Sequence, residues 1–329
     1  MTRRRVIVAA IVLCALLPGC LKPEPSRETG NEPLTSPRSC RAVYGFTVSY
    51  GEQWLAYYGT GKAIHLESLP GREPLGSLTY RNLEVRCAVF HPVESSLLAC
   101  YVDGNVVQWS HADGAWQLRL LGRLKDELTC CAVSSAGDRF AVGNYAGDVA
   151  VWSLGPEPRL VKSLQHGRPV WDVQFSPDGS ELAAGGTMGT LTLWNTETWS
   201  ATDVTTGHRG VVSAVAHSAD GRVLVTAGYD GIVKATDRRS GRRMWTTRLS
   251  KHGIRTVAFS PDGRALAVGT IFSGELQMLN GSTGRLLGGF PTHLATVTQV
   301  RFLTDGTLLT SSHDGTVMSF RSSLEPAWD

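Results

Sequence analysis

Nine histidines and seven cysteines are the side chains of this chain best suited to ligate a metal or to act in catalysis. Their spacing matches neither a zinc-binding cysteine pair nor a His-Glu-x-x-His helix. Cys130 and Cys131 are adjacent, and neighbouring residues do not easily present both side chains to one ion. The sequence also lacks a nucleophile elbow and a calcium-binding loop. We therefore expect no catalytic residue, no metal site and no cofactor.

Glycines recur at intervals of about 42 residues, a length typical of one propeller blade. One series is Gly137, Gly179, Gly221, Gly263 and Gly306. A second series, in phase with the first, is Gly104, Gly147, Gly189, Gly231, Gly274 and Gly315. Short alternating segments such as residues 173–175 precede the first series, as expected for a strand that enters an Asp-Gly hairpin. The repeat predicts an all-β, seven-bladed β-propeller of four-stranded antiparallel blades, with six blades as the alternative.

The order of turns and strands resembles the WD-repeat family from about residue 42 to residue 321. The family's Trp-Asp pair is incomplete in each repeat, as in Trp152-Ser153 and Trp194-Asn195. The family also has a tetrad of His, Ser or Thr, Asp and Trp that stabilises the blade. The residues at its positions include His208, Thr226 and Asp230 in one repeat and His293 with Asp314 in the last. The resemblance implies that these are structural hydrogen-bonding residues.

Residues 1–19 have the pattern of a secretory signal peptide, with three arginines before an apolar segment. The segment ends in Leu17-Pro18-Gly19-Cys20, which resembles the lipobox of bacterial lipoproteins, although Pro18 departs from the usual small residue. That resemblance implies that Cys20 is lipidated; an ordinary signal peptide is the alternative. Residues 20–39 are rich in proline and serine and are predicted to form a disordered tether. Residues 40–329 are predicted to form the propeller.

The same resemblance implies export to the bacterial cell envelope and a lipid anchor in the membrane. Leu21, which follows the cysteine, favours the periplasmic side of the outer membrane in a host with two membranes. Without Arg3, Arg4 and Arg5 the 32 basic residues become 29, which equals the 29 acidic residues. A nucleic-acid-binding protein usually carries a basic excess or a basic face. We therefore expect no nucleic-acid partner.

In an exported chain the cysteines outside the signal peptide and the lipidation site can form disulfides. Cys87 and Cys100 flank a predicted turn, and pairing Phe90 with Leu97 would place the two cysteines opposite each other. The sequence thus permits a cross-strand disulfide, although a shift of one residue would separate the two thiols.

Two positions of each repeat should lie at one end of the ring, where loops held by a rigid scaffold can recognise partners. The second residue of the innermost strand is Arg86, Trp171 or Arg255 in three repeats. The residue two before the second-turn glycine is Tyr145, Tyr229, Phe272 or His313 in four repeats. Aromatic residues and arginine are enriched at binding hot spots, so we predict that these seven residues form a partner-binding rim. The alternative is that Tyr145 and Tyr229 only pack between blades.

These features favour a monomeric, membrane-tethered, non-catalytic scaffold for protein–protein interaction. An accessory lipoprotein of outer-membrane barrel assembly is a related alternative. The competing class is a propeller enzyme of the lactonase or quinone-cofactor type, whose metal is ringed by carboxylates or amides at the channel mouth. Asp172 is the clearest acidic residue on an innermost strand, and one carboxylate cannot form such a ring.

Overall fold

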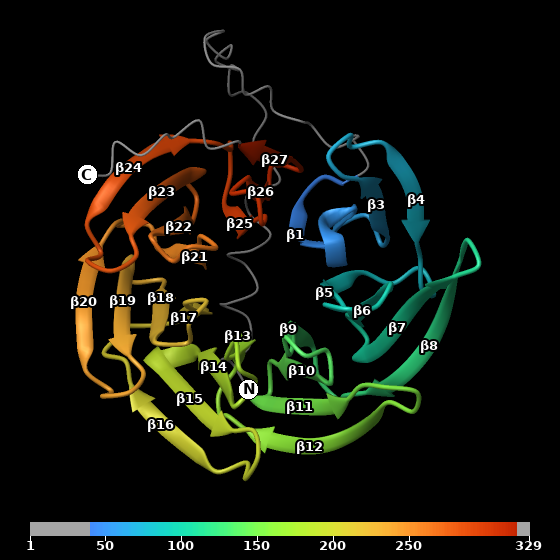
Figure 1. The fold of residues 1–329 in the computed structure, drawn as a ribbon, viewed down its shortest axis with the longest axis horizontal. Helices are drawn as coiled ribbons and strands as arrows, with labels where there is room; N and C mark the ends of the chain where they lie inside the picture. Colours follow the sequence, from blue (N-terminus) through green and yellow to red (C-terminus); the bar gives the residue numbers. More distant parts are fainter. Residues whose placement is uncertain (1–39, 321–329) are drawn as a thin grey trace, which may run out of the picture. The chain divides into compact units, whose positions relative to one another are not determined.

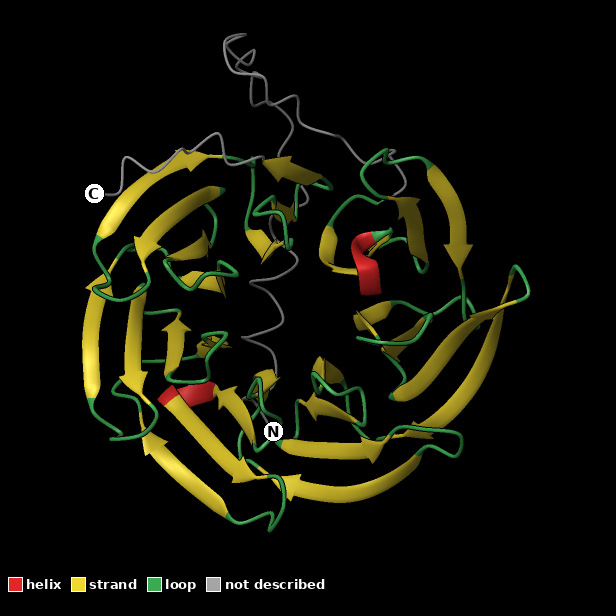
Figure 2. Ribbon diagram, in the orientation of Figure 1, coloured by secondary structure: helices red, strands yellow, loops and turns green. Residues whose placement is uncertain are grey.

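The computed structural model describes residues 40–320. They form seven antiparallel sheets arranged radially around a central axis (Figure 1). Strands and loops make up nearly all of this ring, with two short 3-10 helices (Figure 2). The predicted seven-bladed, all-β fold is confirmed. The predicted signal peptide, Cys20 and tether lie outside the described residues.

Each blade uses consecutive strands, and the first strand of each blade lies nearest the axis (Figure 1). Blades 1 and 2 comprise β1 (Val43–Val48), β2 (Trp54–Gly59), β3 (Ile64–Ser68), β4 (Pro74–Leu78), β5 (Val85–Phe90), β6 (Ser96–Tyr101), β7 (Asn105–Ala112) and β8 (Ala115–Arg123). Blades 3 and 4 comprise β9 (Leu128–Val133), β10 (Arg139–Asn144), β11 (Asp148–Ser153), β12 (Arg159–Gln165), β13 (Val170–Phe175), β14 (Glu181–Gly186), β15 (Thr190–Asn195) and β16 (Ala201–Thr205).

Blades 5 and 6 comprise β17 (Val212–His217), β18 (Val223–Gly228), β19 (Ile232–Asp237), β20 (Arg243–Arg248), β21 (Ile254–Phe259), β22 (Ala265–Thr270), β23 (Glu275–Asn280) and β24 (Leu286–Pro291). Blade 7 comprises β25 (Val297–Phe302), β26 (Leu308–Ser312) and β27 (Val317–Phe320). The 3-10 helices are η2 (Tyr50–Glu52) and η3 (Thr187–Gly189). Blades 1 to 6 have four strands, whereas blade 7 has three within residues 40–320.

The first and last blades meet and close the ring. The backbone N–H of Phe46 donates to Gln299 Oε1 at 2.9 Å, and Thr298 Oγ1 donates to the Val43 carbonyl at 3.1 Å. These bonds join β1 to β25.

Neighbouring blades pack closely because the second strand of a blade carries small residues. A Cβ atom on Gly185 would lie 2.8 Å from Val212 Cγ1, and one on Gly143 would lie 2.7 Å from Val170 Cγ1. Both distances are shorter than a van der Waals contact, so each valine of the next innermost strand occupies the space left by a glycine. Farther from the axis, Trp152 and Trp194 at the ends of third strands are almost fully buried.

A β-bulge follows the first residue of each of the seven innermost strands. In β13, for example, Val170 pairs with Gly186 and Asp172 pairs with Gly185, so Trp171 is unpaired. The bulged residues are Tyr44, Arg86, Thr129, Trp171, Ser213, Arg255 and Thr298. A bulge leaves one residue out of the ladder and redirects its side chain. The fold therefore repeats one specialised position seven times around the axis.

Candidate functional site

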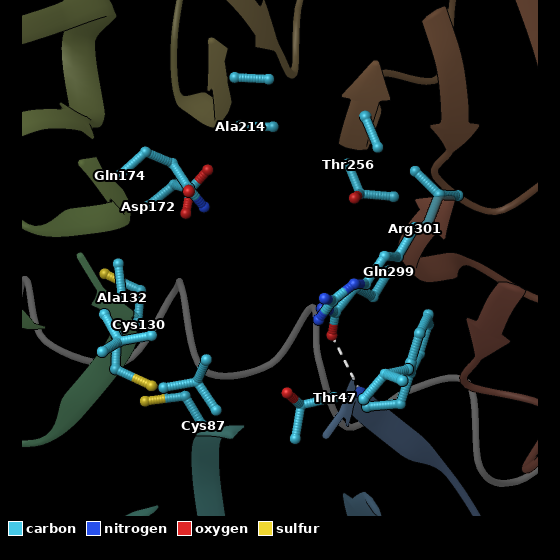
Figure 3. Close-up of a pocket in the computed structure, with 18 of the residues that line it drawn as sticks. Thr47, Cys87, Cys130, Ala132, Asp172, Gln174, Ala214, Thr256, Gln299 and Arg301 are labelled. Atoms are coloured by element: carbon cyan, nitrogen blue, oxygen red, sulfur yellow. Dashed lines mark hydrogen bonds between the residues drawn. The ribbon is translucent and has the colours of Figure 1, made fainter. Parts of the chain in front are cut away.

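A channel of about 980 Å³ follows the axis and is lined by residues of all seven innermost strands. We define the upper face of the ring as the one where these strands begin and the lower face as the one where they end. All seven bulged residues line the channel, and they lie at its upper end because each is the second residue of its strand. Figure 3 shows the polar side chains below this mouth, including Asp172, Gln174 and Gln299.

The bulged residues divide into small hydroxyl residues and large side chains. Ser213 Oγ donates to the Ile254 carbonyl at 2.6 Å, and Thr298 Oγ1 donates to the Val43 carbonyl. These two hydroxyls are buried and link adjacent blades. The large side chains are Tyr44, Arg86, Trp171 and Arg255, which provide the upper mouth with aromatic and cationic groups. Arg86, Trp171 and Arg255 were predicted at this rim.

Three of the predicted rim residues form a continuous aromatic arc over blades 3, 4 and 5. The ring centroid of Trp171 lies 6.1 Å from that of Tyr145 and 5.6 Å from that of Tyr229. Tyr229 remains 39% exposed. The buried Trp171 Nε1 has no hydrogen-bond partner among the described residues. A buried N–H without an acceptor is costly.

Charged groups lie on the upper face between the aromatic arc and blade 1. Arg86 forms ion pairs with Glu127 and with Glu84, the latter at 3.6 Å. Burial and a hydrogen bond with Glu84 raise the pKa of Tyr44 to about 12. The Tyr44 ring in turn meets His313 edge to face, with 6.0 Å between centroids. Arg86 is therefore held by two carboxylates rather than presented as a free cation.

Tyr44, Glu84 and Glu127 belong to the rim but were not predicted there. The first repeat is the most degenerate, so the glycine register does not identify Tyr44. The residue after the buried aliphatic residue that begins each innermost strand is the signal that finds it, because the bulge always falls at that position. The two glutamates precede strands β5 and β9 and lie in linking segments that the repeat does not constrain.

Arg255 and Phe272 have different positions on the predicted rim. Arg255 Nη1 donates to the Ser213 carbonyl at 3.3 Å. Burial and the charge of Arg255 lower the pKa of His313, which places these two residues near each other. Phe272 is 60% exposed and makes no aromatic ring contact within residues 40–320. The structure thus brings six of the seven predicted residues into two linked groups and leaves Phe272 outside them.

The histidines at tetrad positions form buried hydrogen bonds. His208 Nδ1 lies 3.0 Å from Asp230 Oδ1, and its Nε2 lies 2.9 Å from Thr226 Oγ1. In the last blade, His293 Nδ1 lies 3.3 Å from Asp314 Oδ2. Burial raises the pKa of Asp314, but hydrogen bonds with His293, Thr316 and the Leu294 N–H together with the charge of His293 outweigh it, and the resulting pKa is about 2. These side chains fasten the loop before an innermost strand to the turn of the same blade.

His217 stands where neighbouring repeats carry Phe175 and Phe259. It is partly buried, and both of its ring nitrogens lack a partner among the described residues. Burial lowers the pKa of His217 to about 4, so the ring stays neutral near neutral pH. Its environment is that of a core substitution.

Cys87 and Cys100 are directly opposite each other on β5 and β6, as the predicted register requires. Both are free thiols in the structure, and the disulfide stays a prediction. A third thiol, Cys131 of β9 in the next blade, joins them, and the three sulfur atoms all lie within 4.8 Å of one another. Sequence spacing could not reveal this cluster, because its members come from three strands of two blades.

Two carboxylates line the channel within the described part of the chain, and they do not form one site. Glu52 accepts hydrogen bonds from the backbone N–H and hydroxyl of Thr304 at the lower face. Asp172 lies near the upper mouth and accepts the Val215 N–H at 2.8 Å. Burial raises the pKa of Asp172 to about 7. This arrangement does not provide the ring of carboxylates that a metal-dependent propeller enzyme uses.

Comparison with known families is consistent with this architecture. The WD domain, G-beta repeat model matches residues 158–195 and 199–237, which cover β12–β15 and β16–β19. The model for the WD40 domain of anaphase-promoting complex subunit 4 matches residues 235–305. With the seven-bladed ring, these matches support a WD-repeat β-propeller.

Several curated proteins are similar to this chain over part of their length. The periodic tryptophan protein 2 homolog of Dictyostelium discoideum is 28% identical over 69% of this chain and 25% of its own length. The protein LST8 homolog of Drosophila melanogaster is 26% identical over 35% of this chain and 39% of its own length. The chain thus spans about a quarter of the length of the first relative. Both organisms are eukaryotes, so these matches do not bear on the predicted bacterial lipoprotein.

No helix among residues 40–320 is long and apolar enough to cross a membrane.

Proposed function

We propose that this protein is a non-catalytic scaffold that binds a protein partner at the upper mouth of its channel. The observation that carries the proposal is the aromatic arc Tyr145–Trp171–Tyr229, in which a buried indole N–H lacks an acceptor. Aromatic side chains offer large contact areas at low entropic cost, and they dominate binding hot spots. The bulges hold these side chains on a rigid sheet, so little ordering is needed on binding.

The chemistry of the rim indicates the kind of surface that it binds. Arg86 is neutralised by Glu84 and Glu127, and the mouth therefore presents aromatic faces more than net charge. A peptide segment with an apolar side chain would fit, because the aromatic faces offer it a large apolar contact area. We propose such a segment of a protein as the ligand, with the scaffold itself monomeric.

The second part of the proposal concerns location. We propose that Cys20 is lipidated after removal of residues 1–19 and that residues 20–39 tether the propeller to a bacterial membrane. This part rests on the Arg-rich start, the apolar segment and the lipobox-like residues alone. In a host with two membranes, Leu21 favours the periplasmic side of the outer membrane.

Site-specific photo-crosslinking in intact cells tests the binding proposal. A photoreactive phenylalanine analogue is placed at Tyr229 on the upper face and, as the matched control, at Tyr50 in η2 on the lower face. Both tyrosines are exposed. We expect a discrete protein adduct from position 229 that is absent from position 50 and weakened by Trp171→Ala. Equal adducts from both positions, or none from position 229, would contradict an upper-face binding site.

A further inference from the structure

The three thiols between blades 2 and 3 lie in an otherwise apolar layer. Cys87 and Cys100 belong to a buried cluster that includes Leu98, Val106 and Phe140. Cys131 enters from β9 of the adjacent blade. A single buried cysteine behaves as a small apolar residue. Three sulfur atoms that converge from separate strands differ from such a single cysteine. Apolar packing could use other small residues at these positions and does not require sulfur at all three.

We propose that Cys87, Cys100 and Cys131 form a three-coordinate site for a soft monovalent metal ion, Cu(I). Soft thiolate ligands select Cu(I) over hard cations. All three sulfur atoms lie within 4.8 Å of one another. Metal–sulfur bonds of about 2.3 Å place three trigonal sulfurs roughly 4 Å apart, so the thiols need to close by less than 1 Å. Within residues 40–320 no other set of three potential ligands is so close.

The identity of the ligands distinguishes Cu(I) from zinc. Structural zinc sites are four-coordinate and usually closed by a fourth cysteine or a histidine. The neighbouring Cys130 does not belong to the cluster, because successive residues of a strand point to opposite faces. No histidine or carboxylate joins the three sulfurs in the described structure. A trigonal site of sulfur alone is therefore the geometry that these side chains can make.

The channel provides a path by which an ion reaches this site. Cys87 and Cys131 line the channel, whereas Cys100 lies behind them and is fully buried; Figure 3 shows Cys87 on the channel wall. Each thiol that ligates the ion releases its proton. Burial raises the pKa of Cys87 and Cys100. Burial also opposes ionisation of Cys131, but hydrogen bonds from the other two thiols outweigh it and lower its pKa.

Anaerobic titration of the reduced, purified full chain with Cu(I), in competition with a chromophoric Cu(I) chelator, tests the proposal. We expect one tightly bound ion per chain and three sulfur neighbours in its X-ray absorption spectrum. Cys131→Ser should weaken binding at least 100-fold. Cys130→Ser, the matched control on the same strand, should change it less than threefold. Equal affinity in both variants, or an ion bound by nitrogen or oxygen, would overturn the site.

A second measurement uses the unsubstituted protein, so that it does not depend on the folding of a variant. Alkylation of the native chain followed by peptide mapping should show that Cu(I) protects Cys131, the partly exposed thiol of the three, but leaves the reactivity of Cys130 unchanged. Protection of none of the three thiols would overturn the proposal. A Cys87–Cys100 disulfide that persists in the folded protein under reductant would also overturn it, because only one of the three ligands would remain. Neither result bears on partner binding at the upper mouth.

Discussion

The indole ring of Trp171 meets the ring of Tyr229 edge to face, with 5.6 Å between their centroids. The two residues belong to different blades and to different repeat positions, one in a bulge of an innermost strand and the other in a turn. Such a contact stabilises the pair by roughly 1 kcal/mol beyond the area that it buries. It also orients the indole at the channel mouth. The same contact therefore packs two blades together and positions the indole for a partner.

Replacing Trp171 by Ala should therefore separate the two roles. If the arc binds a partner, we expect affinity to fall by about 2 kcal/mol, as for a hot-spot residue, with a smaller change in the free energy of unfolding. The reason is that Trp171 fills the channel mouth rather than the buried layer between blades. Calorimetric affinity for the crosslinked partner and chemical denaturation of the same samples provide the two numbers.

The opposite pattern of affinity and stability would contradict a partner-binding role for the rim. A large loss of stability in Trp171→Ala, combined with unchanged affinity once only folded protein is compared, would mean that the aromatic arc is a packing device. Arg255→Ala is a useful companion, because Arg255 lines the same mouth and makes one hydrogen bond to a backbone carbonyl.

The periodic glycines allowed the fold to be predicted because the turns impose a local requirement. Gly179, Gly221 and Gly263 all adopt φ near +70°, a conformation that residues with a Cβ atom rarely adopt. This constraint acts within a few residues, so it is visible as a spacing. The same regularity located Trp171 and Arg255 at the channel mouth, because equivalent positions of a propeller point to equivalent places around the axis.

Contacts between blades could not be predicted in this way. Cys131 approaches Cys87 and Cys100, whereas the spacing of Cys130 and Cys131 predicts no metal site. Spacing describes ligands on one segment, whereas this cluster is assembled by the stacking of blades 2 and 3. The ion pair of Arg86 with Glu127 also links two blades, and it depends on a linking segment that the repeat does not specify.

The His208 hydrogen bonds should contribute measurably to stability. His208→Ala removes bonds to Asp230 and Thr226 and leaves both groups without their partner. We expect a loss of about 2 kcal/mol in the free energy of unfolding. His252 precedes β21 as His208 precedes β17, but it is exposed, so His252→Ala should change stability by less than about 0.5 kcal/mol. Equal losses in the two variants by urea denaturation would refute a special role of the His208 bonds.

Lipidation at Cys20 predicts a simple change of cellular location. Cys20→Ser removes the thiol that would carry the lipid, so the propeller should move from the membrane fraction to the soluble fraction. Fractionation of cells that express each form, followed by immunoblotting, measures the distribution. Ser39→Ala, a substitution at the end of the predicted tether, is the control and should leave the distribution unchanged. Retention of the Cys20→Ser protein in the membrane fraction would exclude the lipid anchor.

Asp172 should make the stability of the propeller depend on pH. Burial raises its pKa from 3.8 to about 7, so the folded chain holds this proton more tightly than the unfolded chain does. The resulting stabilisation is complete below about pH 4 and is lost as the pH rises to about 7. Asp172→Asn stays neutral at each pH and can still accept the Val215 N–H. Between about pH 4 and pH 7 its free energy of unfolding should therefore rise by on the order of 2 kcal/mol relative to that of the unsubstituted protein. This value is smaller than the full pKa shift would give, because the channel admits water. Urea denaturation of both proteins at pH 4, 5, 6 and 7 measures the difference, and parallel stability curves would show that Asp172 ionises freely in the folded channel.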